Sequence, residues 1–257
     1  MKDSCFVRAV LLAAALPVFP AYGASAELLE SLETQMGQAA ISARFQSSDA
    51  FSFTEAQEVR TLAVLEATYR AVRADFPALA DQVAVTIIPV DRDLSAVGHV
   101  SGRSDAPGVV VLEISMSGAG GVDGAILDGL ESTFAHELHH LVRGWTISGN
   151  RFGPGIAIAA ANEGLAVVYA ATLTGKAYAG NAPPAAGLAI EWAREVRGLP
   201  LHADYGQWMF AHPDGRAAVG YRTGSFIVRR AMENSGREIV DLSTLNPDEI
   251  WSLAEID

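Results

Sequence analysis

Residues 136–140 read His-Glu-Leu-His-His, and the rest of the chain is best interpreted outward from this stretch. On a helix, His136 and His140 lie on one face, about 5–6 Å apart at Cβ, so both ring nitrogens can reach one Zn²⁺. Glu137 is rotated off that line and can reach a water on the metal without binding the metal, which suits a general base. His136 with His139 could also chelate, but that pair leaves Glu137 without a role.

The residues around the motif predict an amphipathic helix that ends soon after it. Arg143-Gly144 is typical of a helix C-terminus, because glycine adopts the left-handed cap without strain. Apolar residues recur at spacings of 3, 4, 4 and 3, at Leu127, Leu130, Phe134, Leu138 and Leu141. Histidines on such a helix can also be satisfied without a metal, so a third ligand is needed to support the metal interpretation.

A second helix, expected over residues 154–174, offers that third ligand. Glu163 is its only ionisable carboxylate, and the neighbouring helical positions are small and apolar. A buried carboxylate without a cation is costly, so a metal held by His136 and His140 is its natural partner. Two histidines and one glutamate leave a fourth position for water, as a catalytic zinc site requires. The alternative is a surface glutamate on a half-exposed helix.

Residues 1–26 have the pattern of a secretory signal. Two basic residues precede a short apolar stretch, and Ala24-Ser25-Ala26 fits a cleavage site. The only cysteine, Cys5, lies in this segment, so the mature chain would contain neither a disulfide nor a thiolate ligand. Export from a bacterial cytoplasm, to the periplasm or the medium, is the simplest interpretation, and an uncleaved anchor is the alternative.

The charge of the chain limits its partners. Net charge is −12, and the loss of Lys2, Asp3 and Arg8 with the signal would make it −13. Such a protein is not expected to bind nucleic acid or anionic membranes. No later stretch is expected to span a membrane, so we expect no stable membrane association after cleavage. Residues 27–257 suit one domain, and the oligomeric state stays open.

The remaining periodicities predict an α+β fold, with a small sheet beside a mainly helical body. β-branched residues predict strands over 83–90 and 108–115, and a short strand at 97–101 between them. The strand before the motif helix could offer its edge to an extended peptide, although an ordinary core strand explains it equally well. Residues 200–214 are expected to be rich in loops. Further helices are expected over residues 27–43, 54–76, 187–197, 216–234 and 246–253.

The two motif helices together resemble a known family. His-Glu-Leu-His-His followed by Asn162-Glu163-Gly164-Leu165-Ala166 is similar to the gluzincin metallopeptidases and, more closely, to a bacterial family of predicted zinc-dependent proteases. That family also carries Gly-Tyr-x-x-Gly near its end, here at residues 220–224. The resemblance spans about residues 105–235 and implies a zincin-like fold, zinc as cofactor and Glu163 as third ligand. Val167 stands where thermolysin-like enzymes carry an acidic residue, so what orients the histidines is open.

These features predict a metallopeptidase that acts on peptides or proteins. Zinc would polarise the scissile carbonyl and activate a water, and Glu137 would accept the proton of that water. Tyr221 is the expected donor to the developing oxyanion, because its phenol stays protonated at neutral pH; a purely packing tyrosine is the alternative. Competitors for that role are His202, Tyr205, His212 and Arg222.

Two other functions stay open. One is a zinc hydrolase of a non-peptide amide or ester. The other is a non-catalytic peptide-binding or chaperone-like module with a structural zinc. The presence of Glu137 weighs against the non-catalytic module, because a structural zinc site needs no base.

Overall fold

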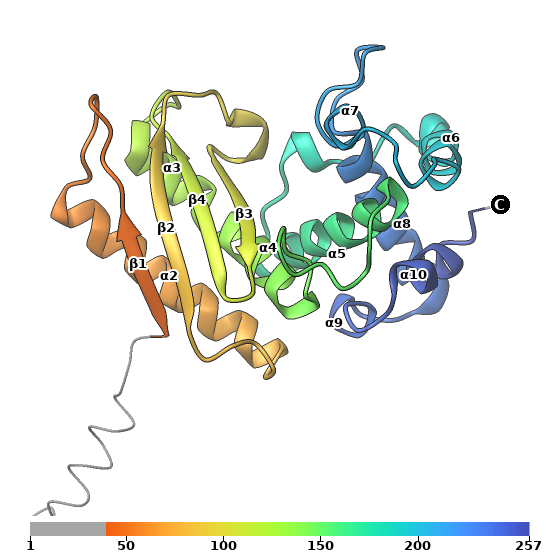
Figure 1. Cartoon of the computed structure of the whole chain (residues 1–257), viewed down its shortest axis with the longest axis horizontal. Coiled ribbons are helices and arrows are strands. Elements are labelled where there is room, and N and C mark those ends of the chain that lie inside the picture. The colour runs from red at the N-terminus through yellow and green to blue at the C-terminus, as the bar shows by residue number, and fades with distance from the viewer. Residues whose placement is uncertain (1–39, 257) are drawn as a thin grey trace, which may run out of the picture. The chain divides into compact units, whose positions relative to one another are not determined.

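The computed structural model describes residues 40–256. The first half of this range contains a four-stranded sheet (Figure 1). Its strands are β1 (Ile41–Phe45), β2 (Val83–Val90), β3 (Val100–Ala106) and β4 (Val109–Ser115). The expected signal over residues 1–26 lies outside the described residues, as does most of the helix expected over 27–43. Residues 41–43 form part of β1, so that helix prediction is wrong there.

The order of the strands places β3 at an edge beside the helices. The order is β1-β2-β4-β3, with β1, β2 and β4 parallel and β3 antiparallel to β4. A tight turn at Gly108, with φ of 72°, folds β3 back outside β4. Of the two interpretations of the strand before the motif helix, the core strand is confirmed, because β4 is paired on both sides. The short strand expected at 97–101 is only partly confirmed: β3 begins at Val100 and runs to Ala106, and residue 97 lies in a 3-10 helix instead.

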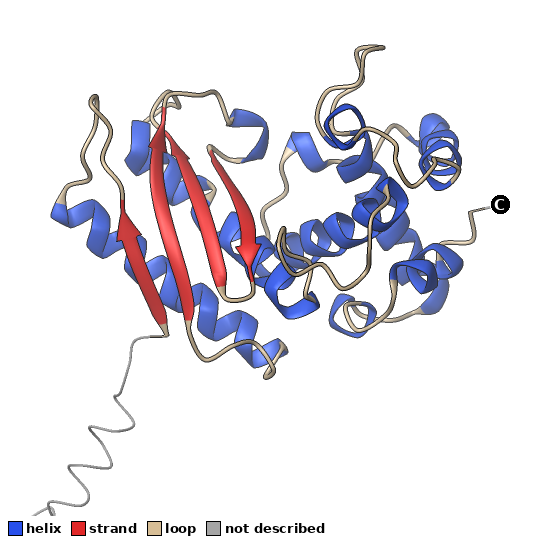
Figure 2. Ribbon diagram, in the orientation of Figure 1, coloured by secondary structure: helices blue, strands red, loops and turns tan. Residues whose placement is uncertain are grey.

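Three helices cover one face of this sheet, as Figure 2 shows: α2 (Glu55–Asp75), α3 (Gly121–Asp128) and α4 (Leu130–Arg143). Alternate strand residues point into the core beneath them, and Val83, Val85 and Ile87 are at most 1% exposed. Thr54 caps α2 with a capping box, as its sequence predicts. Val59, expected on the buried face of α2, is instead 61% exposed.

The predicted motif helix is broken into α3 and α4 at Gly129. A Cβ at this position would lie 2.1 Å from the carbonyl oxygen of Gly98, so only glycine allows the backbones to approach so closely. Leu127, assigned from the sequence to the apolar face, lies on the far side of this break and is 68% exposed. The motif itself lies on α4, which ends at Gly144 with the left-handed cap predicted for it.

The second half of the chain is helical and is built around α5 (Ile156–Thr174), which packs against α4 and α8 (Val219–Ser235). This arrangement confirms the predicted α+β fold class. Two short helices were not expected: α7 lies within the loop-rich segment, and α9 follows α8. The other elements are η1 (Ser95–Val97), η2 (Ala179–Asn181), α6 (Ala186–Arg197), α7 (Tyr205–Met209), α9 (Ile239–Leu242) and α10 (Pro247–Leu253).

Helix α5 is also long and apolar enough to cross a membrane, contrary to the expectation from sequence. However, 72% of its most apolar 18-residue window is buried inside the protein. Such burial is what the core helix of a packed domain requires.

Helices α5 and α8 cross at a pair of glycines. A Cβ on Gly164 would lie 2.3 Å from the backbone of Gly224, and a Cβ on Gly224 would lie 2.0 Å from the carbonyl oxygen of Ala160. No side chain therefore separates the two helices at this point. Because Glu163 and Tyr221 lie next to the crossing in sequence, the contact brings both residues to the same region.

Candidate metal centre

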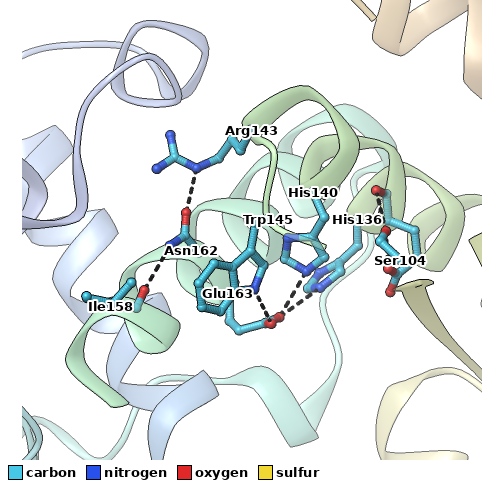
Figure 3. Close-up of polar contacts among 9 residues, drawn as sticks. Ser104, His136, His140, Arg143, Trp145, Ile158, Asn162 and Glu163 are labelled. Atoms are coloured by element: carbon cyan, nitrogen blue, oxygen red, sulfur yellow. Dashed lines mark hydrogen bonds and ion pairs between the residues drawn. The ribbon is translucent and has the colours of Figure 1, made fainter. Parts of the chain in front are cut away.

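Three nitrogen and oxygen atoms converge between α4 and α5. Glu163 Oε2 lies 3.1 Å from Nε2 of His136 and 3.1 Å from Nε2 of His140 (Figure 3). Two ligands that each lie about 2.0–2.1 Å from a tetrahedral zinc are separated by roughly 3.3 Å. The three atoms therefore have the spacing of ligands to a single ion, and the donor set of two imidazoles and one carboxylate suits zinc.

The predicted alternative pair, His136 with His139, is not formed. His139 is fully buried on another side of α4, where its Nε2 lies 2.8 Å from Ser243 Oγ. Its ring also stacks on Tyr169, with centroids 5.2 Å apart. It therefore belongs to the core.

Glu163 is held as a carboxylate by its neighbours. It is only 5% exposed, and burial alone would raise its pKa. The adjacent His140 and His136 outweigh burial and lower the pKa below its ordinary value. A carboxylate that stays ionised in a buried position can bind a cation.

Trp145 supplies a further contact to Glu163 that the sequence did not suggest. Its indole Nε1 donates a hydrogen bond to Glu163 Oε1 at 3.1 Å, while Oε2 faces the two histidines (Figure 3). The backbone N–H of Trp145 also donates to the carbonyl oxygen of His140 at 2.9 Å, which fixes the chain just beyond the helix cap. In the sequence, Trp145 stands out only as a tryptophan directly after the predicted C-cap glycine, which does not by itself indicate a contact with Glu163.

A buried arginine joins α4 to α5 and to the segment after α9. Arg143 is 1% exposed, and its Nε donates to Asn162 Oδ1 at 2.9 Å (Figure 3). The same guanidinium donates to the backbone carbonyls of Ser243 and Leu245. Because Asn162 precedes Glu163, this network fixes the part of α5 that carries the third candidate ligand.

Glu137 is buried beside the histidines and shares its carboxylate with β3. Ser104 Oγ donates to Glu137 Oε2 at 2.9 Å, so β3 holds this oxygen of the carboxylate. Burial, reinforced by the negative charge of Glu163, raises the pKa of Glu137 to about 7, although His136 and Ser104 oppose the shift. A carboxylate with a pKa near neutrality is well matched to proton transfer at neutral pH.

Gly102 makes room for this carboxylate. A Cβ on Gly102 would lie 2.6 Å from Glu137 Cγ and 2.7 Å from Oε1. Ser104 and Gly102 are alternate residues of β3, so both face α4. Neither residue is among the site residues predicted from the sequence, because the short strand was expected to end at residue 101.

The outer edge of β3 is open at Gly102. The carbonyl of His99 accepts from Ser115 on β4, whereas those of Val100 and Ser104 accept from Thr133 and Ile147, outside the sheet. Because backbone groups of successive residues point to opposite edges, the N–H and C=O of Gly102 also point away from β4. Among residues 40–256, none pairs with these two groups, so a backbone donor and acceptor on the strand edge lie beside Glu137.

A large cleft, about 1630 Å³ in volume, contains all of these groups. Its lining includes the two histidines, both glutamates, Gly102, Ser104 and Trp145. Tyr221, Tyr205 and Arg222 also line it, but His202 and His212 are not among its lining residues. His212 is instead paired with Asp214, its Nδ1 2.8 Å from Oδ1. Among the four competitors to Tyr221, the structure therefore keeps only Tyr205 and Arg222 near the centre.

Tyr221 lies in the first turn of α8 and lines the same cleft as Glu163 and Glu137. Burial raises the pKa of its phenol well above the ordinary value, and Glu163 and Glu137 raise it further. The hydroxyl therefore stays protonated and can donate a hydrogen bond at any working pH.

Comparison with known protein families identifies the family of this chain. The family model described as Predicted Zn-dependent protease (DUF2268) matches residues 62–252. This range contains both histidines, Glu137, Glu163 and Tyr221. No curated protein and no solved structure matches the chain. The family and the His136-Glu137-His140 group, whose ligand atoms lie within 4.8 Å of one another, agree on zinc as the cofactor.

Proposed function

Because the chain belongs to the family of predicted Zn-dependent proteases, we propose that it is a gluzincin-like metallopeptidase that hydrolyses peptide bonds. One observation carries the proposal. A buried carboxylate, Glu137, lies between the two candidate histidine ligands and the strand edge at Gly102, where no described residue pairs with the backbone. A structural zinc site requires neither the base nor the edge.

Each residue has a distinct part in this proposal. His136, His140 and Glu163 hold zinc, which polarises a carbonyl and lowers the pKa of water when bound. Glu137 accepts the proton of the attacking water on Oε1 and returns it to the leaving amine. Ser104, bonded to Oε2, keeps the carboxylate turned toward that water. Tyr221 donates to the oxygen that becomes negative.

The edge of β3 supports a peptide as the substrate. An extended segment can pair with the N–H and C=O of Gly102 as an added strand, which places its backbone beside Glu137. The acidic net charge of −12 argues against nucleic acid as a partner.

The proposal is tested on one purified protein by its zinc content and its cleavage of a peptide library. Glu137→Gln should retain zinc and lose cleavage, because an amide cannot accept the proton. Glu163→Ala should lose zinc. Zinc binding with cleavage of esters or non-peptide amides alone would favour the other hydrolase. Peptide binding without any hydrolysis by the wild type would favour the non-catalytic module.

We further propose that the mature protein begins at Glu27 and acts in the periplasm or outside the cell. The pattern of basic residues, apolar stretch and Ala24-Ser25-Ala26 supports this. Intact-mass measurement of protein from the cell envelope and medium should give the mass of residues 27–257. A mass that starts at Met1 would contradict it.

A further inference from the structure

The large apolar side chains that remain exposed are not scattered evenly. Among the described residues, seven large hydrophobic side chains are exposed, and four of them line the cleft of the metal centre. These four are Ile147, Leu201, Tyr205 and Phe210, which are 74%, 68%, 44% and 59% exposed. Exposed apolar side chains that gather at one cleft mark a binding surface, whereas isolated ones need no explanation.

Three of them come from residues 201–210 and line one cleft with the metal centre; we call Leu201, Tyr205 and Phe210 the apolar wall. The ring centroids of Tyr205 and Phe210 lie 6.0 Å apart, and those of Phe210 and Tyr221 lie 6.4 Å apart. Tyr221 and Glu163 both line the cleft, so the row of aromatic rings lies in the same cleft as the third candidate ligand. Glu163 and Glu137 also raise the pKa of Tyr205, after burial, which agrees with this proximity.

The wall is held in place from behind. Met209, the last residue of α7, is fully buried, although Tyr205 and Phe210 on either side of it in sequence are exposed. A Cβ on Gly220 would lie 2.0 Å from Met209 Sδ, so that glycine lets the methionine anchor the wall to α8. Ala218 N–H also donates to the carbonyl oxygen of Phe210 at 2.8 Å. A surface fixed in this way binds a ligand without first having to be ordered.

Ile147 lines the cleft beside β3. Its backbone N–H donates to the carbonyl oxygen of Ser104 at 3.0 Å, so this residue covers the β3 edge two residues beyond Gly102. A segment paired at Gly102 would therefore lie close to the side chain of Ile147, in the cleft that the apolar wall also lines. Wall and edge together define a site for an extended chain with a bulky apolar residue.

We propose that the apolar wall selects substrates, so that the protein acts on extended peptides with a large aliphatic or aromatic residue beside the scissile bond. This inference rests on the proposed peptidase function and names its substrate class. The matching chemistry on the substrate side is that of unfolded or flexible polypeptide, since folded proteins bury such residues.

The test compares paired peptides that differ only by Phe or Gly at one position near the cleavage site. For the wild type, kcat/KM should favour the Phe peptide by about 10–200-fold, the range of discrimination that an apolar pocket provides. Phe210→Ser and Leu201→Ser should reduce this preference at least about tenfold, through a loss of kcat/KM for the Phe peptide.

The chain provides matched controls for both substitutions. Leu127 is exposed to 68%, like Leu201, and Val59 to 61%, close to Phe210 with 59%, but neither control residue lines the cleft. Leu127→Ser and Val59→Ser should leave the preference unchanged. Circular dichroism melting curves would verify that all four variants fold.

A binding measurement separates this inference from the proposed activity. Anisotropy of the same labelled peptides with zinc-loaded Glu137→Gln should show tighter binding of the Phe peptide, lost in Glu137→Gln/Phe210→Ser. Equal binding of the Phe and Gly peptides, or an equal effect of Leu127→Ser, would overturn the inference. Failure of the wild type to cleave any peptide, with the binding preference intact, would overturn only the peptidase proposal.

Discussion

The indole N–H of Trp145 donates to Oε1 of Glu163 at 3.1 Å, on the oxygen that does not face the histidines. Partners of this kind orient metal ligands, and their loss typically costs 10–100-fold in metal affinity. We therefore expect Trp145→Phe to weaken zinc binding by about that factor, measured by chelator competition.

Trp251→Phe is the control for that substitution. Trp251 is 3% exposed, and its Nε1 donates to the carbonyl oxygen of Ala157 at 2.9 Å, so the variant also loses a buried hydrogen bond. It should lower stability by about 1–3 kcal/mol and leave zinc affinity unchanged. Equal zinc affinity in the two variants would show that Trp145 does not position Glu163.

The raised pKa of Glu137 should appear in the stability of the metal-free protein. With a pKa of 4.5 when unfolded and about 7 when folded, Glu137 binds more protons in the folded state between these values. Stability must then fall as pH rises through this window, by up to about 3 kcal/mol.

Glu137→Gln lacks this contribution and provides the reference. The free energy of unfolding is measured by urea denaturation at each pH. Between pH 4.5 and 7, the value for the wild type should fall relative to that for Glu137→Gln. Parallel curves would place the pKa of Glu137 at its ordinary value.

The glycine crossing of α5 and α8 should tolerate no side chain. A Cβ on Gly224 would lie 2.0 Å from the Ala160 carbonyl oxygen, and this backbone atom cannot rotate away. Gly224→Ala should lower the free energy of unfolding by about 3 kcal/mol or more, at or above the upper end of overpacking costs.

Gly187→Ala is the matched substitution, because a Cβ there meets nothing within 4 Å. In helix α6 it should be neutral or stabilising by up to about 1 kcal/mol. Similar losses in the two variants would mean that the crossing is looser than the backbone contact indicates.

Tyr221 should act through its hydroxyl. If the phenol donates to the developing oxyanion, Tyr221→Phe should lower kcat by about 10²–10³ with zinc content and stability little changed. Tyr205→Phe, which removes the competing hydroxyl in the same cleft, should have a much smaller effect. A loss below about threefold in Tyr221→Phe would make Tyr221 a packing residue and leave Tyr205 and Arg222 as candidates.

Much of the local structure could be predicted from the sequence. The strand over 83–90 has the predicted bounds. Thr54 caps the start of α2 and Gly144 caps the end of α4, as predicted. These features depend on neighbours only a few residues away, such as caps and alternating β-branched residues. The break at Gly129 could not be foreseen, because it depends on the backbone of Gly98, which is distant in sequence.

The sequence by itself determined the metal motif, because the spacing of His136 and His140 on a helix fixes their common face. It also singled out Glu163, since an isolated carboxylate in an apolar helix needs a cation. Only the tertiary structure decided what surrounds them. The order of the strands brings Ser104 and Gly102 to Glu137, and the loop after α4 brings Trp145 to Glu163. Contacts between segments that are distant in sequence produce no periodic pattern from which they could be predicted.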